Sequence, residues 1–218
     1  AVDVLRKSTT LKCTLMPYLY SAAVEAHQTG VPAMRAMLLE FPQDIPCQDL
    51  DRQYMLGERL LVAPVFTKEG DVDYYLPAGT WTNLLDNRVV EGGRWLHEVH
   101  DFMSLPLMVR ENTLLPIGAD DQNVEYDYGK DLTLHLFALK DQARADVKDM
   151  YGNPMLTARA KNEDGSVTLT FEGRAQNLSL VLRNVHQVKD LAGAEAQDTE
   201  LGLKLTVNAA LDSVTFTL

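Results

Sequence analysis

The sequence contains little cysteine. Of its 218 residues only Cys13 and Cys47 are cysteines, and neither belongs to a C-x-x-C or another paired pattern. Disulfide-bonded small domains and structural zinc sites need several closely spaced cysteines, so neither of them is the basis of this fold. Unpaired cysteines are typical of a reducing compartment, and we therefore expect a cytoplasmic protein.

Long apolar runs are also missing. A helix that spans a bilayer needs about 20 predominantly apolar residues, and no stretch of this chain approaches that length. The first residues, AVDVLRKSTT, lack the apolar core of a secretory signal peptide. The sequence therefore predicts neither a membrane-spanning segment nor export.

Basic side chains are outnumbered by acidic ones. The chain has 20 Lys and Arg against 31 Asp and Glu, a net charge of −11. Such a field repels phosphate backbones and anionic lipid, so we expect no nucleic-acid partner and no membrane partner. Glycine-rich phosphate loops and Ser/His/Asp nucleophile patterns are absent as well, and no cofactor is predicted. A neutral ligand such as a sugar would be indifferent to this charge.

The N-terminal part combines a helical pattern with a continuously apolar one. Residues 3–28 carry apolar side chains at spacings of four and seven, which predicts an amphipathic helix ending at Thr29-Gly30. Pro17 removes a backbone hydrogen bond, so a kink or break is expected near residue 16. PAMRAMLLEF, residues 32–41, has apolar residues at both odd and even positions, as in a parallel strand buried on both faces. A short helix is expected over 51–56.

Short, often alternating segments divided by turn residues fill the chain from Glu58 onward. This spacing is typical of β-sandwiches. In SVTLTF apolar residues alternate with threonine, and Asp164-Gly165 just before it predicts a hairpin turn. The acidic stretch 118–131 is the best candidate for a junction. We therefore predict a mainly β fold with two β-sandwich domains, a proximal one at 58–125 and a distal one at 126–218, preceded by the helix and strand of residues 1–57.

Four motifs carry a resemblance to a known family. They are MPYLYSAAVEAHQTGVPAMRAMLLEFPQD, DRQYMLGERLLVAPVF, YYLPAGTWTNLLDN and LPLMVRENTLLPIG. In this order and approximate spacing they resemble the C-terminal part of glycoside hydrolase family 31. The rest of the chain, through LSLVLRNV to the final SVTFTL, is similar to the bacterial cytosolic α-xylosidases of that family.

The resemblance implies a fold and an activity for a larger parent enzyme. It implies a catalytic (β/α)₈ barrel followed by the two sandwiches, so residues 1–57 would be the last helices and the eighth strand of the barrel. The implied reaction is retaining hydrolysis of an α-glycoside, here a terminal α-xyloside, by two aspartates on earlier strands. This chain contains neither of these aspartates. By itself it is expected to be inactive.

The resemblance also implies the partners of this chain. They are the oligosaccharide substrate of the parent enzyme and the missing N-terminal catalytic barrel, which the sandwiches would brace. Subunit contacts in a homo-oligomer are a further expected role. A barrel strand without its neighbours exposes unpaired backbone at both edges, so residues 1–57 should fold back on the first sandwich, pair with a second copy or lose order.

Three residues of the apolar segment 32–41 have expected roles. Arg35, close to its start, can be buried only if it is paired, which predicts a structural ion pair. On the family mapping Glu40 and Phe41, at the opposite end, come nearest to the rim of the active site. A supporting position behind that rim is one interpretation of them, and core packing is the alternative.

Other polar clusters have plainer interpretations. Asp44, Asp49 and Asp51 could in principle supply an acid and a base, but turn and helix-cap chemistry is the favoured interpretation. His97, His100 and Asp101 place three potential metal ligands within five residues. On a strand the two histidines point to opposite faces and no fourth ligand is suggested, so no metal site is predicted.

Aromatic side chains support an alternative function. Trp81, Trp95, Tyr126 and Tyr128 could present stacking faces to a sugar, which would make the chain a carbohydrate-binding β-sandwich module. Aromatic residues on strands more often pack in the core. Both interpretations stay open from the sequence alone.

Overall fold

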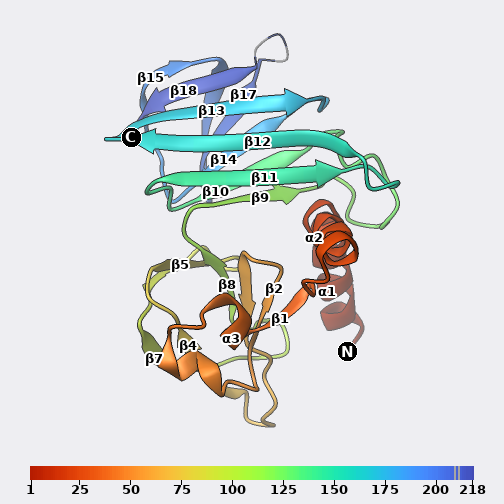
Figure 1. The fold of residues 1–218 in the computed structure, drawn as a ribbon, viewed down its shortest axis with the longest axis vertical. Helices are drawn as coiled ribbons and strands as arrows, with labels where there is room; N and C mark the ends of the chain where they lie inside the picture. The colour runs from red at the N-terminus through yellow and green to blue at the C-terminus, as the bar shows by residue number, and fades with distance from the viewer. Residues whose placement is uncertain (209, 211) are drawn as a thin grey trace. The chain divides into compact units, whose positions relative to one another are not determined.

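The computed structural model describes residues 1–208, 210 and 212–218 (Figure 1). The chain is mainly β, with helices at its N-terminus and several antiparallel sheets, which confirms the predicted fold class. It divides into two compact units: unit 1 comprises residues 1–7 and 25–111, and unit 2 comprises residues 8–24 and 112–218. No helix in the described part is long and apolar enough to cross a membrane.

Two consecutive helices open the chain. α1 covers Val2–Thr14 and α2 covers Met16–Thr29, so the predicted break near residue 16 is confirmed. Pro17 lies in the first turn of α2, where its missing N–H would have no partner within the helix in any case. Gly30 ends α2 with a φ of +80° and donates its N–H to the Ala26 carbonyl at 2.9 Å. This left-handed residue is a common helix terminator.

The apolar segment 32–41 differs from its prediction. The long parallel strand is wrong: β1 covers only Met34–Ala36, pairs antiparallel with β2, and is followed by the helical turn α3, Met37–Glu40. A run with apolar residues at both odd and even positions is equally compatible with a short strand and a helical turn. The expected helix over 51–56 is also wrong, because Tyr54–Leu56 forms β2, and the nearest helical turn before it is the 3₁₀ helix η1, Ile45–Gln48.

Unit 1 joins this segment to the following strands. One sheet has the order β1-β2-β3-β8-β5-β6, and β4 and β7 form a separate two-stranded ribbon; all these pairs are antiparallel. The segment has therefore folded back on the sheet that follows it, one of the three expected outcomes. The strands are β3 Leu60–Val62, β4 Asp71–Leu76, β5 Thr80–Asn83, β6 Val89–Glu91, β7 Arg94–Val99 and β8 Leu107–Arg110.

Unit 1 has its own hydrophobic core. It joins residues from α3, η1 and both sheets, and its largest fully buried side chains include Trp81 and Tyr74. Burial of one such large side chain contributes about 1.5–3 kcal/mol, so the core stabilises the short α3, which contributes Met37 to it.

Unit 2 is a β-sandwich of two five-stranded sheets, with orders β16-β17-β14-β10-β9 and β11-β12-β13-β18-β15. Figure 1 shows the second sheet lying across the first. Among the pairs of named strands in the described residues, only β10–β14 is parallel. The strands are β9 Thr113–Ile117, β10 Thr133–Phe137, β11 Gln142–Lys148, β12 Pro154–Glu163, β13 Ser166–Gly173, β14 Ser179–Arg183, β15 Lys189–Ala192, β16 Ala194–Thr199, β17 Gly202–Val207 and β18 Ser213–Thr217.

The sandwich follows the alternation of its sequence. On β13 Val167 and Leu169 are 0% exposed and belong to the core, whereas Thr168 and Thr170 face solvent. Asp164 and Gly165 form the β12–β13 turn with φ values of 51° and 92°, which confirms the predicted hairpin. β9 lies before residue 126 and pairs with β10. The domain boundary at 125/126 stays a prediction.

Candidate functional site

Arg35 forms a buried ion-pair cluster in unit 1. The side chain is 5% exposed, and its two terminal nitrogens lie 2.6 Å from Glu40 Oε1 and 2.7 Å from Glu25 Oε2. Its Nε donates to the Pro32 carbonyl at 3.0 Å. Burial acts to lower the pKa of Arg35, but Glu40 and Glu25 outweigh it and the pKa is raised. The predicted structural ion pair is confirmed.

Glu40 connects three elements of unit 1. Besides Arg35 of β1, its second carboxylate oxygen lies 3.9 Å from a guanidinium nitrogen of Arg110 on β8. The Arg110 guanidinium sits 4.9 Å from the centre of the Phe41 ring, which in turn lies 6.3 Å from Trp81. A carboxylate held between two arginines is suited to positioning neighbouring groups. The predicted place of Glu40 and Phe41 behind a catalytic rim stays a prediction.

The four predicted sugar-stacking residues have different environments. Trp81 is 1% exposed and donates its indole N–H to the Pro77 carbonyl at 2.8 Å. Tyr128 is 3% exposed, and the half-buried Tyr126 meets it edge-on at 4.8 Å and donates to the Cys13 carbonyl. These three rings belong to the interior of their units. Trp95, 56% exposed, is the one whose ring remains open.

A hollow of about 320 Å³ lies beside Trp95 in unit 1. One wall is the segment from Asp49 to Gln53, and the other runs through Phe66 and Thr67 to Asp73. The Gln53 side chain is buried and makes two hydrogen bonds to the backbone of Tyr75 on β4, of 2.7 and 2.8 Å. This amide fixes the first wall to the ribbon as a neighbouring strand would.

The outer face of the β4–β7 ribbon supplies the polar side of the hollow. Tyr75 stands opposite Trp95, and Asp73 stands opposite His97. The His97 ring lies 2.9 Å from Asp73 and 3.6 Å from Asp71, so it holds both carboxylates in place. The pattern of alternate residues on two paired strands explains why these side chains share one face.

The opposite face of β7 carries a polar network that sequence reasoning missed. Glu98, with a side chain 13% exposed, accepts from Arg88 and lies 2.9 Å from His100 Nε2. His100 Nδ1 lies 3.0 Å from Ser104 Oγ. Burial acts to raise the pKa of Glu98, but the bonds from Arg88 and His100 outweigh it and the pKa is lowered. His97 and His100 thus contact separate partners.

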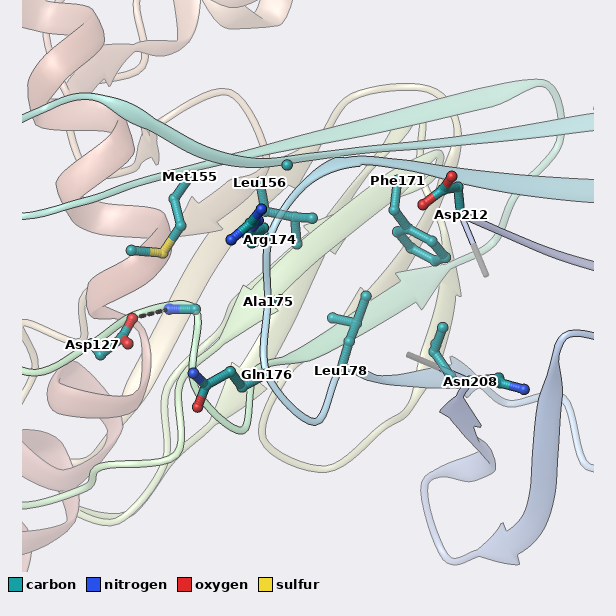
Figure 2. A pocket seen from close by; sticks show the side chains of 13 residues that line it. Asp127, Met155, Leu156, Phe171, Arg174, Ala175, Gln176, Leu178, Asn208 and Asp212 are labelled. Atoms are coloured by element: carbon teal, nitrogen blue, oxygen red, sulfur yellow. Dashed lines mark hydrogen bonds between the residues drawn. The ribbon is translucent and has the colours of Figure 1, made fainter. Parts of the chain in front are cut away.

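Unit 2 has a hollow of its own at one end of the sandwich, of about 500 Å³ (Figure 2). Leu156, Phe171 and Leu178 form its apolar side. Polar side chains, among them Arg174 and Gln176, stand at its edge. Figure 2 shows the residues converging from β12, β13 and the loop that precedes β14. A small ligand with an apolar face would fit such a hollow.

Two family models match this chain. Residues 30–115 match the C-terminal domain of glycosyl hydrolase family 31, and residues 127–218 match the model described as "Alpha-xylosidase YicI, C-terminal domain". The chain belongs to glycoside hydrolase family 31. It consists of C-terminal domains of an α-xylosidase-like member, which confirms the resemblance inferred from its motifs.

Curated relatives in this family include α-xylosidases. The chain is 36% identical to α-xylosidase XylQ of Lactiplantibacillus pentosus over 178 residues, 79% of this chain and 23% of that protein. It is 43% identical to an α-xylosidase of Emericella nidulans over 124 residues, 53% of this chain and 16% of that protein. The chain thus spans about a quarter or less of the length of these relatives.

A solved family 31 structure shows the same fold. The Flavobacterium johnsoniae dextranase complexed with isomaltotriose has a TM-score of 0.83 at 22% identity, covering 99% of this chain and 33% of the dextranase. Such relatives are family 31 enzymes that bind oligosaccharides, with the catalytic barrel elsewhere in their chains.

The sequence motifs predicted some residues of these sites and missed others. They pointed to Arg35, Glu40 and Phe41 because these residues lie inside the motif that contains PAMRAMLLEF. They did not reveal the Trp95 hollow, whose walls come from separate segments. The only signal for it was the alternation of polar and aromatic residues on β4 and β7.

Proposed function

We propose that the parent protein is a retaining α-xylosidase and that this chain is its non-catalytic C-terminal part. The observation that carries the proposal is the match of residues 127–218 to an α-xylosidase C-terminal domain, together with the two α-xylosidase relatives. The oligosaccharide substrate of the parent would carry a terminal α-linked xylose. Two aspartates outside this chain would act as nucleophile and acid/base in the usual retaining reaction.

We further propose that unit 1 braces the catalytic barrel. Four large apolar side chains of β1, α3 and η1 are exposed although their neighbours Arg35 and Met37 are buried: Met34 by 63%, Leu38 by 46%, Leu39 by 51% and Ile45 by 77%. An exposed apolar surface of this kind marks an interaction site. The chain spans 23% of its L. pentosus relative, so the preceding barrel is the nearest available partner. Residues 1–57 would be its last part.

The proposed activity is tested with p-nitrophenyl α-xyloside. The purified chain, freed of host enzymes, should give no hydrolysis, whereas the parent enzyme should hydrolyse this substrate faster than the α-glucoside. Reproducible turnover by the chain alone would refute its non-catalytic role. A parent enzyme that prefers the α-glucoside would refute the α-xylosidase assignment.

The bracing role has a separate test. A separately expressed barrel fragment should bind the purified chain, and Leu39→Lys should weaken this binding by about tenfold because a charge would be buried at the contact. Phe102→Lys is the matched control, since Phe102 is an equally apolar residue, 88% exposed, in another loop of unit 1. If the two variants weaken binding equally, the surface around Leu39 is not the contact. In that case self-association of the chain, measured by sedimentation, tests the homo-oligomer instead.

We also propose a cytoplasmic location for the parent. Cys13 and Cys47 are both free and buried, and burial first, then Asp44, raises the pKa of Cys47 to about 11. A thiol with so high a pKa is unreactive, and two unpaired buried cysteines suit a reducing compartment. Fractionation of the source cells should recover the α-xyloside-hydrolysing activity with the cytoplasmic markers, and recovery outside the cell would contradict this location.

A further inference from the structure

The ring of Trp95 is held open above the hollow of unit 1. It is 56% exposed, and its centre lies 5.8 Å from the centre of the Tyr75 ring at an interplanar angle of 56°. Because Tyr75 is its cross-strand partner, the position of the indole is fixed by the β4–β7 register. Within the part of the chain that the structure describes, no partner is recorded for the Trp95 indole N–H. The ring therefore offers a flat apolar face and a hydrogen-bond donor together.

The walls of the hollow are tied to the same ribbon. Gln53 fixes the first wall through its two bonds to Tyr75, and Thr67 donates to the Asp71 carbonyl at 2.8 Å on the second. The volume of about 320 Å³ is at the lower end of the roughly 300–1,000 Å³ of small-molecule sites. Its size suits one or two sugar rings, and its construction does not require large rearrangement on binding.

Polar side chains in the hollow have unused hydrogen-bonding capacity. Among the described residues the side chains of Asp49, Asp51 and Arg52 form no hydrogen bond or ion pair, although all three line the hollow. Carboxylate and guanidinium groups are planar and bond in pairs, which matches two neighbouring hydroxyl groups of a sugar. Asp73, held by His97 at 2.9 Å, adds a carboxylate of fixed position.

The charges of the hollow narrow the class of ligand. Four aspartates face one arginine along its lining, so an anion would be repelled. In the described residues no group of three His, Cys, Asp or Glu side chains is placed to hold a metal ion. Together with the exposed indole of Trp95, this lining suits a neutral ring with an apolar face and several hydroxyl groups at its edge.

We propose that the hollow beside Trp95 binds a neutral pyranose, stacked on the indole and hydrogen-bonded by Asp49, Asp51 and Arg52. On the proposed α-xylosidase function, on which only the choice of sugar rests, the ligand is an α-xyloside or a short xylose-bearing oligosaccharide. Trp95 supplies the apolar contact and Asp51 and Arg52 supply selectivity for hydroxyl groups. The expected affinity is in the millimolar range because one ring forms few contacts.

The two tryptophans of the chain provide a direct measurement. The ¹⁵N-labelled chain is titrated with methyl α-D-xylopyranoside and with isoprimeverose, and the two indole N–H signals are followed by NMR. The Trp95 signal should shift and saturate. The Trp81 signal should stay in place, because its N–H is bonded to Pro77 in the core. Variants assign the two signals and locate the site.

Matched variants test the contribution of each group. Trp95→Ala should weaken binding by about tenfold, the amount expected for loss of an aromatic contact. Asp51→Asn should weaken it severalfold while the melting temperature is unchanged. Phe102→Ala, which removes an aromatic ring exposed by 88% outside the hollow, should leave the affinity unchanged. Unaltered affinity in Trp95→Ala would overturn the proposal.

Two further outcomes would also overturn it. One is a Trp95 signal that does not respond to any of the sugars, including methyl α-D-glucopyranoside. The other is a response to choline chloride that exceeds the response to sugars and falls with added salt, since this would identify a cation site. Saturable binding of the glucoside in preference to the xyloside would keep the site and would count only against the α-xylosidase assignment, which the hydrolysis assay of the parent tests independently.

Discussion

At the scale of single residues, Arg35 shows how a charged side chain occurs in a buried apolar segment. Its guanidinium reaches Glu25 on α2 and Glu40 on α3, so one side chain connects the helix before β1 to the turn after it. A buried ion pair contributes little net stability compared with apolar packing, but removal of one partner leaves the other uncompensated. The cluster therefore fixes geometry more than it adds stability.

Replacement of Arg35 should reveal this asymmetry. We expect Arg35→Met to lower the free energy of unfolding by about 2–4 kcal/mol, because Glu40 stays 14% exposed with only the more distant Arg110 beside it. Urea denaturation measures the loss. Arg144→Met, which removes an exposed pair with Asp146, should change it by less than about 1 kcal/mol. Equal losses in the two variants would contradict the assigned role of the cluster.

His135 should make the stability of unit 2 depend on pH. It is 9% exposed, and burial, with Arg183 nearby, lowers its pKa to about 3. The unfolded chain titrates near 6.5, so below that pH it takes up a proton that the folded chain does not. The free energy of unfolding should therefore fall as the pH is lowered from about 6.5 towards 3, by about 2–3 kcal/mol at pH 4.5.

A non-titrating variant isolates this effect. His135→Gln keeps an acceptor for the Arg183 guanidinium, which lies 3.1 Å from His135 Nδ1, and should flatten the dependence on pH between 6.5 and 4 in urea titrations. His186→Gln, at an exposed histidine, should keep the steep dependence because His135 is still present. A slope unchanged in His135→Gln would assign the effect to other groups.

At the scale of elements, the register of β12 and β13 depends on two glycines with different surroundings. Gly165 in the turn has a φ of +92° and open space where a Cβ would be, whereas Gly173 has a φ of +103° and the Met155 carbonyl oxygen 2.2 Å from that position. Backbone strain applies to both. Steric overlap with backbone applies only to Gly173.

Replacing each of these glycines with alanine should distinguish the cost of backbone strain from the cost of steric overlap. Gly165→Ala should cost about 1 kcal/mol, the amount expected for a left-handed residue gaining a side chain. Gly173→Ala should cost at least about 3 kcal/mol, because the β12 backbone must also move. Thermal unfolding followed by circular dichroism compares the two. A similar loss in both variants would show that the ends of the two strands separate easily.

Some elements could be predicted from the sequence pattern and others could not. The helix break at Pro17 and the hairpin at Asp164-Gly165 are local effects of backbone chemistry, and both were predictable. The structure of segment 32–41 was not predictable, because the length of β1 depends on its pairing with β2, in which Arg35 lies opposite Met55. A continuous apolar pattern contains no periodicity that distinguishes a strand from a helical turn.

At the scale of the whole molecule, the chain has one hydrophobic core in each unit. Both tryptophans, Trp81 and Trp95, lie in unit 1, so tryptophan fluorescence reports on that unit alone. Circular dichroism reports on the strands of both units. The two signals can therefore be compared within one sample as a test of cooperative unfolding.

Core variants should move the two signals separately. Leu169→Ala, at a fully buried site of β13 in unit 2, should cost about 2–5 kcal/mol and lower the dichroism midpoint while the fluorescence midpoint stays. Leu61→Ala, at an equally buried site of β3 in unit 1, should lower the fluorescence midpoint. If either variant shifts both midpoints equally, the units unfold as one cooperative body.

The mainly β class, the family and the presence of an ion pair at Arg35 could be predicted from the amino-acid sequence. These properties depend on local periodicity, on motifs of contiguous residues and on the rule that a buried charge needs a partner. Which of the two tryptophans is exposed depends on how distant segments pack together. Trp81 and Trp95 are both strand residues, but core packing encloses one, while the ribbon register and the walls from Asp49 to Gln53 and from Phe66 to Asp73 leave the other facing a hollow. Such a site is assembled from segments distant in the chain, and no single stretch of sequence encodes their contact.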